Sequence, residues 1–407
     1  MNSIDLGWEE SPKIPFEKRS HISILLGAGF SAPKGYPTGN DINKALLNLE
    51  KTPIFFNTEG KLSEADEKTI LENREYPNPY EKYFSFCKEI ISVYAKEQEF
   101  DYEYFFDFIK SEAIYAEQYK TIRNKYMSNE ISYHELITSV SSIYNQVVAY
   151  FIKDSDGYQK YEHFPYRLGY VEHYDNFLKL LSNLKERYII DVHTLNHDLF
   201  FESLNKTEYI NGDISDGFDE FGSEYYGLLP IENESYHCRL KRYTGYYNTA
   251  IRLYKLHGSI NYILYYKDCN NILLPDKCIK LPAGISPSYL LKGKGSKKHY
   301  EESPFTDHAN FLTGTTSKIR QYNSPYFYKK LFHKFRKNLK KSTNLIIIGY
   351  GGRDSGINNI LLECYKNKPV YIITPDAQTN ENIKKLAAQL HAETLSIGVQ
   401  DIQPNLI

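Results

Sequence analysis

Two short segments place polar side chains that can do chemistry directly after apolar runs of the chain. In TLNHD (194–198), Asn196 and Asp198 follow such a run, and in KLHGS (255–259), His257 precedes a glycine. An imidazole in this position can act as a general base or hydrogen-bond a sugar hydroxyl. A neutral amide suits orientation of a reacting group, and a carboxylate favours developing positive charge. If the turns after these runs point the side chains toward a crevice, both segments supply polar groups to one site.

Two other segments place glycines where an apolar run gives way to a helix-like stretch. They are ILLGAGFSAPKGYPTGNDI (24–42) and IIIGYGGRDSGINNIL (346–361). A glycine-rich turn lets backbone N–H groups approach a phosphate, and a helix N-terminus adds partial positive charge. The small residues are explained if a pyrophosphate sits against Gly27, Ala28, Gly29 and Ser31. Pro33 stands where the third glycine of G-x-G-x-x-G would be, which disfavours an ordinary dehydrogenase.

Each segment also has a simpler interpretation that involves no ligand. The first glycine turn can be a tight turn only, and Asn196 or Asp198 can cap a helix that starts near residue 198. His257 can be a hydrogen-bonded core histidine. The second glycine turn can be a plain strand–helix connection in which Asp354 is an N-cap. Single segments leave both interpretations open.

The elements that must position these residues alternate between strands and helices. Short apolar runs suited to strands buried on both faces of a parallel sheet occur at 21–27, 188–196, 251–258, 344–351 and 369–374. Amphipathic helical patterns occur at 175–186 and 326–341, the latter with a basic opposite face. This alternation predicts an α/β, Rossmann-like, doubly wound parallel sheet.

Other stretches interrupt that alternation. Residues from about 60 to 170 are mostly helical in pattern, for example at 132–154, and predict a helical module inserted into the sheet domain. The stretches at about 206–250 and 265–320 are polar and aromatic with weak periodicity, and we interpret them as smaller excursions. The segment 291–299 is a strongly basic loop. We therefore expect an N-terminal arm at 1–20 and a single domain at 21–407.

Composition limits the class of protein. The chain has 407 residues, a formal net charge of −2 and 38 tyrosines against one tryptophan, so its overall charge gives no argument for nucleic acid or membrane binding. Its five cysteines are scattered and include no C-x-x-C pair, which argues against a zinc site and a disulfide framework. The N-terminus lacks the apolar region of a signal peptide. We expect a cytoplasmic protein that does not associate with membranes.

Taken together and in this order, the four segments resemble the NAD-binding landmarks of the sirtuin superfamily. That family carries G-A-G-x-S, T-x-N-x-D, H-G and a late G-x-G turn, and the match covers about half of the chain. Protein-deacylating sirtuins also carry zinc-binding C-x-x-C pairs and G-I-P-D-F-R, where this chain has no such pairs and reads GYPTGND. They usually have glutamine at the position of Leu195. The chain is thus more similar to the zinc-less, sirtuin-like NAD glycohydrolases of bacterial antiphage defence, the group that includes the Thoeris effector.

This resemblance implies that NAD is the substrate, that no zinc is bound and that Asn196 and His257 carry NAD hydrolysis. The transition state should resemble an oxocarbenium ion. The pyrophosphate is expected to lie against Gly27, Ala28, Gly29, Phe30 and Ser31, with Phe30 beside the nicotinamide. Asn196 would position the ribose or water, His257 would accept a proton and Asp198 would steady the nicotinamide end. Gly349, Tyr350 and Asp354 would line the adenosine side.

An enzyme that destroys NAD is toxic to its own cell, so its activity needs control. The chain ends soon after the last expected strand–helix units, without room for a Thoeris-type sensor domain, which predicts control by assembly. The resemblance implies a homo-oligomer and, as a partner, a hexameric DNA-translocating ATPase of the HerA type, with nucleic acid contacted at most indirectly. Alternatives are an NAD-dependent protein deacylase and a non-catalytic scaffold that binds NAD or ADP-ribose. A nucleic-acid-acting enzyme has only the basic segments at 291–299 and 326–341 in its favour.

Overall fold

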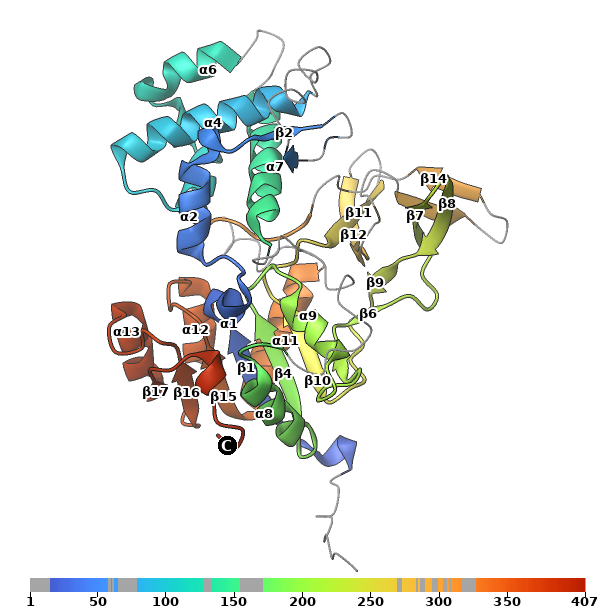
Figure 1. Cartoon of the computed structure of the whole chain (residues 1–407), viewed down its shortest axis with the longest axis vertical. Coiled ribbons are helices and arrows are strands. Elements are labelled where there is room, and N and C mark those ends of the chain that lie inside the picture. The colour runs from blue at the N-terminus through green and yellow to red at the C-terminus, as the bar shows by residue number, and fades with distance from the viewer. Residues whose placement is uncertain are drawn as a thin grey trace, which may run out of the picture.

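A seven-stranded parallel sheet forms the centre of the molecule (Figure 1). The computed structural model describes residues 15–57, 60, 62–64, 79–126, 133–153, 171–268, 273–282, 285, 290–294, 299–302, 306, 309–315 and 327–406. The strands of the sheet, in spatial order, are β17 (Glu393–Leu395), β16 (Val370–Ile373), β15 (Ser342–Ile348), β1 (Ser20–Leu26), β4 (Tyr188–Thr194), β10 (Ile251–Lys255) and β5 (Ile214–Ser215).

This strand order confirms the expected doubly wound α/β fold. From β1 the chain adds β4 and β10 on one side, then returns to add β15, β16 and β17 on the other, which is the Rossmann order. Each of the five expected strands overlaps an observed one, while β17 and the short β5 were not expected. The order reverses between β1 and β15, which pair directly in parallel register. In such sheets, the crevice beyond the carboxyl ends of these two strands is where ligands bind.

Helices cover both faces of the sheet because alternate residues of its strands point to opposite sides. Ile24 and Leu26 of β1 belong to one apolar cluster, which includes the buried face of α8 (Asp175–Lys185). Leu25 belongs to a second cluster, formed with α11 (Phe327–Lys341), α12 (Ser355–Cys364) and α13 (Glu381–Leu390). The helices expected at 175–186 and 326–341 are therefore confirmed as α8 and α11.

A helical module stands over the carboxyl ends of the strands (Figure 1). Its helices are α2 (Gly39–Leu47), α4 (Tyr80–Glu97), α5 (Tyr102–Ile109), α6 (Lys120–Tyr126) and α7 (Tyr133–Phe151), beside a hairpin of β2 (Ile54–Phe56) and β3 (Leu62–Glu64). Helix α2 precedes the segment expected to form this module but packs with it, since Asn43 Oδ1 accepts a hydrogen bond of 2.8 Å from the Tyr102 amide. Residues 61, 65–78, 127–132 and 154–170 of the expected module lie outside the described residues.

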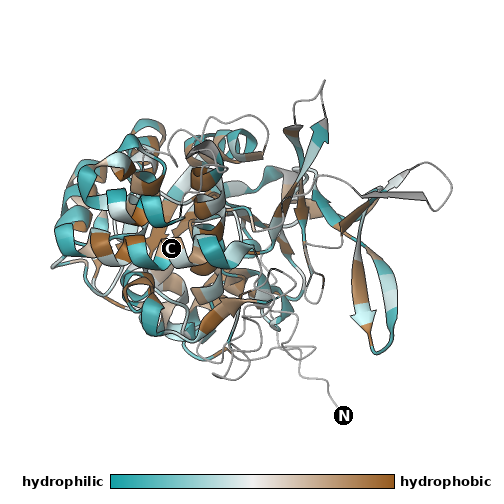
Figure 2. Cartoon of the chain, turned by 90° about the horizontal axis from the view of Figure 1, so that it is seen from above, coloured by the Kyte–Doolittle hydropathy of each residue, from teal (hydrophilic) through white to brown (hydrophobic). Residues whose placement is uncertain are grey.

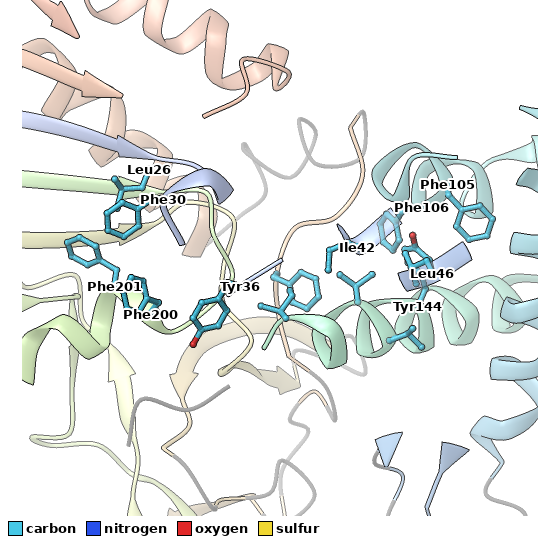
Figure 3. Close-up of a cluster of buried hydrophobic side chains, with 14 of the residues drawn as sticks. Leu26, Phe30, Tyr36, Ile42, Leu46, Phe105, Phe106, Tyr144, Phe200 and Phe201 are labelled. Atoms are coloured by element: carbon cyan, nitrogen blue, oxygen red, sulfur yellow. The ribbon is translucent and has the colours of Figure 1, made fainter. Parts of the chain in front are cut away.

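The core of this module is continuous with the core under the sheet. Figure 3 shows the side chains running from Leu26 and Phe30 at the end of β1, through Tyr36, to Ile42 and Phe106. All five are buried. Because one apolar cluster spans the junction, the module is held against the carboxyl ends of the strands by burial of apolar area.

The two excursions from the sheet contain strands that weak periodicity did not reveal. They form two four-stranded antiparallel sheets, which extend away from the helical body (Figure 2). One sheet has the order β11 (Tyr262–Asp268), β12 (Leu273–Lys280), β9 (Lys241–Tyr243) and β6 (Phe218–Asp219). The other has the order β14 (His299–Glu302), β13 (Leu290–Lys294), β7 (Tyr225–Ile231) and β8 (Glu234–Arg239). Part of the basic segment at 291–299, residues 295–298, lies outside the described residues.

None of the helices in the described part of the chain is long and apolar enough to cross a membrane. Of the expected N-terminal arm, residues 1–14 lie outside the described residues, and the described part contains one short 3₁₀ turn, Phe16–Lys18.

Candidate functional site

A cavity of about 220 Å³ lies at the carboxyl ends of β1, β4, β10 and β15, under the helical module. It therefore occupies the point where the strand order reverses. The sheet side contributes the ends of the strands and the turns that follow them, and the module contributes the first residues of α2 and α5 and the end of α7. The expected site residues that line it are Gly27, Ala28, Asn196, Asp198, His257, Tyr350 and Asp354.

The two glycine turns pack against each other backbone to backbone. A Cβ atom built on Gly27 would lie 2.6 Å from the Gly349 carbonyl oxygen, and one on Gly349 would lie 2.3 Å from the Phe30 nitrogen. Gly349 also has a φ of +62°, a conformation that other residues rarely adopt. Contact between the turns after β1 and β15 thus requires glycine at both positions, whether or not a ligand binds.

Hydrogen bonds between these turns and within the first one engage most of the amides that we expect to hold a pyrophosphate. Gly27 N donates to Ile348 O at 3.0 Å, Gly29 N to Gly349 O at 2.9 Å and Phe30 N to Gly27 O at 2.9 Å. These N–H groups are therefore committed to the fold. Ala28, the first residue of the short helix α1 (Ala28–Ser31), lines the cavity, and the three hydrogen bonds above do not use its amide. Fewer backbone N–H groups are therefore available to a phosphate than the glycine pattern predicts.

Phe30 and Ser31 support the turn from behind and are not among the residues that line the cavity. The Phe30 ring is 1% exposed and packs edge-on against Tyr174 and Phe177. Figure 3 shows it beside Phe201, near the end of β1. This location does not match the expected place of Phe30 beside a bound nicotinamide, because an apolar ring gains more from burial in the core. Ser31 is 1% exposed and bonds to Asn196.

Asn196 ties the turn after β4 to the turn after β1. Its side-chain Nδ2 donates to Gly27 O and to Ser31 Oγ, both at 3.0 Å, and its backbone N–H donates to Thr194 Oγ1 at 3.0 Å. An amide NH₂ group has two hydrogens, so both are used. The side-chain carbonyl oxygen is the group that Asn196 can offer to a ligand in the cavity.

His257 enters the same cavity from the turn after β10. Its side chain is 4% exposed, and its Nε2 lies 3.5 Å from Asp354 Oδ2. The turn is fixed by Gly258, which has a φ of +81°, and by the hydrogen bond of 2.7 Å from Leu312 N to His257 O. His257 is therefore held rigidly beside a carboxylate.

Asp354 is the N-cap of α12 and is fixed from several directions. Its Oδ1 accepts a hydrogen bond of 2.9 Å from Ile357 N, and its backbone N–H donates to Tyr350 Oη at 3.1 Å. Tyr350 in turn donates to Asn358 Oδ1 at 2.9 Å. With Oδ1 engaged in the cap, Oδ2 faces His257. The N-cap interpretation of Asp354 is therefore confirmed, while its side chain lies beside His257 and not on a separate adenosine side of the cavity.

Asp198 forms part of the cavity floor and is buried, with 6% of its surface exposed. Burial raises the pKa of its carboxyl group, against the opposing effect of the Lys255 charge. Its Oδ1 accepts a hydrogen bond of 2.9 Å from Phe200 N, at the start of the short helix α9 (Phe200–Ser203). Asp198 thus caps this turn as well as contributing a carboxylate to the floor.

A buried chain of charges lies beneath Asp198 and was missed from the sequence. Lys255 Nζ donates to Asp198 O and lies 3.2 Å from Glu202 Oε1. Glu202 also lies 3.7 Å from Lys280, which pairs with Asp216 at 2.7 Å. Lys255, Glu202 and Lys280 are all buried. Their charges are compensated within the chain, and they connect the floor of the cavity to β12 in the antiparallel excursion.

The helical module supplies cavity residues that no strand-end pattern indicated. Asp101 caps α5 by accepting hydrogen bonds from the amides of Glu103 and Tyr104, which brings Tyr102 and Glu103 to the cavity wall. Tyr102 Oη donates to Glu103 Oε1 at 3.3 Å. Burial raises the pKa of Tyr102 well above its ordinary value, and nearby Glu103, Asp101 and Asp354 raise it further. The wall above His257 and Asp354 is therefore negatively charged.

Arg353 brings a cation to this lining, and it follows directly on the glycine turn after β15. Its side chain is exposed at the cavity rim, whereas Gly349 is used in packing and does not line the cavity. An arginine beside a glycine turn in GGRDSG is a pattern that the sequence could have flagged as an anion contact. Among the described residues, no group of three or more His, Cys, Asp or Glu side chains could hold a metal ion.

Comparison with known proteins finds similarity among solved structures. No protein-family model and no curated protein matches the chain. A Sir2 homologue in complex with NAD matches with 9% identity and a TM-score of 0.35, covering 96% of this chain and 88% of that one. A Sir2 structure with a p53 peptide and NAD⁺ matches with 10% identity and a TM-score of 0.33, covering 95% and 91%. Sir2Tm bound to a propionylated peptide matches with 9% identity and a TM-score of 0.31, covering 95% and 91%. TM-scores this low carry no argument about function, which has to rest on the chain's own site.

Proposed function

We propose that this chain binds NAD in the cavity at the carboxyl ends of its strands and hydrolyses the nicotinamide–ribose bond. The observation that carries the proposal is the convergence of Asn196 and His257, from the neighbouring strands β4 and β10, on one cavity with the glycine turn after β1. A nucleoside phosphate is the class of ligand that this position in a doubly wound sheet takes. A rigid amide, an imidazole and a carboxylate beside it are the groups that hydrolysis of an N-glycosidic bond needs.

The reaction consumes one water and yields nicotinamide, ADP-ribose and a proton. The water oxygen forms the new bond to C1′ of the ribose, and the electron pair of the glycosidic bond leaves with the nicotinamide nitrogen. His257 accepts the proton from water, and the Asp354 carboxylate stabilises the imidazolium that results. The positive charge on the ribose in the transition state is favoured by the acidic wall that Glu103 and Asp354 form.

The size of the cavity determines which part of NAD it encloses. Sites for small ligands usually have volumes of about 300–1,000 Å³, and this one has 220 Å³. We place the nicotinamide and its ribose inside, against Asn196 and His257. The diphosphate then lies at the rim, where the Ala28 amide and the exposed Arg353 guanidinium can contact it. The adenosine extends past Gly351.

We assign control of the reaction to the helical module, because its side chains line the cavity from above. Ile42, Val148 and Ile152 form an apolar wall, so a displacement of α2 or α7 opens the site to water. A partner that binds the module can therefore switch cleavage on or off. The resemblance to antiphage NAD hydrolases suggests assembly into an oligomer, with a HerA-type ATPase as the candidate partner and abortive defence as the context.

NAD consumption by the purified chain tests the proposal. An etheno-NAD analogue reports cleavage by fluorescence, with wild type, Asn196→Ala and His257→Ala compared, each with and without a HerA-type ATPase. Cleavage that is lost in both variants supports hydrolysis, and His257→Ala should still bind NAD in calorimetry. Because Asn196 also holds the Gly27 turn, a thermal melt of Asn196→Ala accompanies the assay.

An acetyl-lysine peptide added with NAD separates hydrolysis from the alternatives. Nicotinamide release that requires the peptide, with transfer of the acetyl group, identifies a deacylase. NAD or ADP-ribose binding without nicotinamide release in any mixture identifies a non-catalytic scaffold. Either result overturns the proposed hydrolase.

A further inference from the structure

A second and larger cavity, of about 700 Å³, lies between α11, the start of β10 and the loop after β9. It shares no lining residue with the cavity at the carboxyl ends of the strands. His21 at the start of β1 and Arg252 at the start of β10 line it, so it opens toward the amino ends of the strands. The function proposed above makes no use of it.

The α11 side of this cavity is a stripe of lysines. Lys330, Lys334, Lys337 and Lys341 follow the spacing that places side chains on one face of a helix. The opposite face of α11, which includes Leu331 and Phe335, is buried in the core. From Lys330 to Lys341 the helix rises about 16 Å, enough to contact more than one phosphate of an extended strand.

Carboxylate partners for these positive charges are missing from the described residues. Within the described parts of the chain, no carboxylate lies within ion-pair distance of Arg252 or of the four lysines. Burial lowers the pKa of Lys334, and the neighbouring charges of Arg252 and Lys337 lower it further, against the raising effect of Asp191. The Asp191 carboxylate already interacts with two other side chains, because its Oδ2 lies 2.6 Å from His21 Nδ1 and its Oδ1 accepts a hydrogen bond from Tyr254. Such a concentration of charge, in a chain whose net charge is −2, attracts a polyanion.

Tyrosines provide the other side of the cavity. Tyr246 is 68% exposed at the rim, a large aromatic surface left in water. Tyr247 lies deeper, with Lys334 Nζ 4.8 Å from its ring centre, and Lys334 also donates to Gly245 O at 3.1 Å. An exposed aromatic ring beside a row of cations is the arrangement with which proteins stack bases while they hold the phosphate backbone.

We propose that this cavity, lined by the α11 lysines and Tyr246, binds single-stranded nucleic acid. The phosphates lie along Lys330, Lys334, Lys337 and Lys341, and a base stacks on Tyr246. A flat anionic membrane would need neither the concave shape nor the protruding ring. An acidic peptide would use the lysines but not the ring. This inference is independent of the proposed NAD chemistry.

Fluorescence anisotropy with a labelled oligo-dT and an oligo-U of the same length tests the proposal on the full chain. Two variants remove one feature each: Lys330→Gln/Lys337→Gln removes two exposed cations, and Tyr246→Ala removes the ring. Lys384→Gln/Lys385→Gln on α13 is the control with the same loss of charge at exposed positions elsewhere. Tyr246→Phe keeps the stacking surface, and a thermal melt checks the fold of every variant.

We expect the lysine pair variant to weaken binding at least about tenfold and to reduce the slope of log affinity against log salt by about 1.4. Tyr246→Ala should weaken binding about 5–100-fold, while Tyr246→Phe and the α13 control match wild type. Equal affinity of all variants overturns the proposal. So does poly-glutamate, duplex DNA or an anionic vesicle that binds as tightly as the single strand and responds to the lysine variant but not to Tyr246→Ala. Absence of binding at low salt overturns it as well.

Discussion

His257 Nε2 lies 3.5 Å from Asp354 Oδ2, although the histidine follows β10 and the aspartate begins α12. The pair bridges the two sides of the β1 strand, because β10 lies beyond β4 and α12 follows β15. Asp354 Oδ1 caps the helix, and Oδ2 faces the imidazole. The Asp354 carboxylate therefore has two roles, a hydrogen bond that caps α12 and a negative charge beside His257. Substitutions can separate the effects of these two roles.

Replacement of Asp354 by asparagine removes the charge but keeps an oxygen that can cap α12, since asparagine is as good an N-cap as aspartate. We expect Asp354→Asn to leave the free energy of unfolding within about 0.5 kcal/mol of wild type and to lower kcat for NAD cleavage about 100-fold or more. Asp354→Ala should lose the same activity and also about 1 kcal/mol of stability. Chemical denaturation and a nicotinamide-release assay measure the two effects. Full activity in the asparagine variant would show that Asp354 is a helix cap only.

The packed glycine turns allow a prediction with an internal control. In Gly349→Ala, the new methyl group meets the Phe30 nitrogen at 2.3 Å, at a φ of +62°. Backbone strain and overpacking cost about 1–3 kcal/mol each, so we expect a loss of at least about 2 kcal/mol in the free energy of unfolding, together with loss of NAD binding. A Cβ on Gly351, in the same turn, meets nothing within 4 Å, so Gly351→Ala should unfold like wild type. Equal melting temperatures of the two variants would refute the backbone contact.

The parts of the fold and site that lie at strand ends could be predicted from the sequence. Buried strands are short apolar runs, and the turns after them carry polar or small residues, so Asn196, His257 and Asp354 could be connected with one edge of a sheet. What the pattern could not supply is which amides the turns themselves use. Gly27 and Gly29 donate to the chain across the β1–β15 contact, a pairing between residues far apart in sequence.

The remaining residues of the site were missed because they have no local pattern. Glu103 and Tyr102 reach the cavity only because Asp101 caps α5 and because α5 packs on α2, which is a tertiary contact. Lys255 lies within an apolar run of the sequence, and a lysine in such a run usually predicts the exposed end of a strand. Lys255 can be buried because it forms an ion pair with Glu202 and donates a hydrogen bond to the Asp198 carbonyl oxygen.

The position of Glu103 gives a prediction about the helical module. Its carboxylate lines the cavity and adds negative charge near Asp354, so we expect Glu103→Gln to lower kcat/KM for NAD cleavage about 10- to 100-fold by weakening stabilisation of the cationic transition state. Glu112 lies in the same module, is exposed and does not line the cavity, so Glu112→Gln should retain wild-type kinetics. Steady-state assays of both variants measure the difference. If both lose activity equally, the charge of Glu103 has no specific role in the site.

The buried carboxyl group of Asp198 predicts how stability depends on pH. Burial raises its pKa in the folded chain above the unfolded value, and Lys255 opposes this without cancelling it. A folded state that holds the proton more tightly is favoured below the unfolded pKa, and that contribution is lost as pH rises through the folded pKa. At neutral pH, the ionised Asp198 therefore lowers the free energy of unfolding relative to a neutral group of the same shape.

Asp198→Asn supplies that neutral group and keeps an oxygen to accept from Phe200 N. We expect the variant to gain stability relative to wild type as pH rises from about 4 to 7, when both are measured by urea denaturation at each pH, because only wild type must ionise a buried carboxyl group. The same variant should cleave NAD more slowly, since it lacks a negative charge in the cavity floor. Taking the difference between the two proteins removes the contribution of every other titrating group. A difference that stays constant with pH, or that shrinks toward neutrality, would mean that Asp198 is not held in the raised-pKa state.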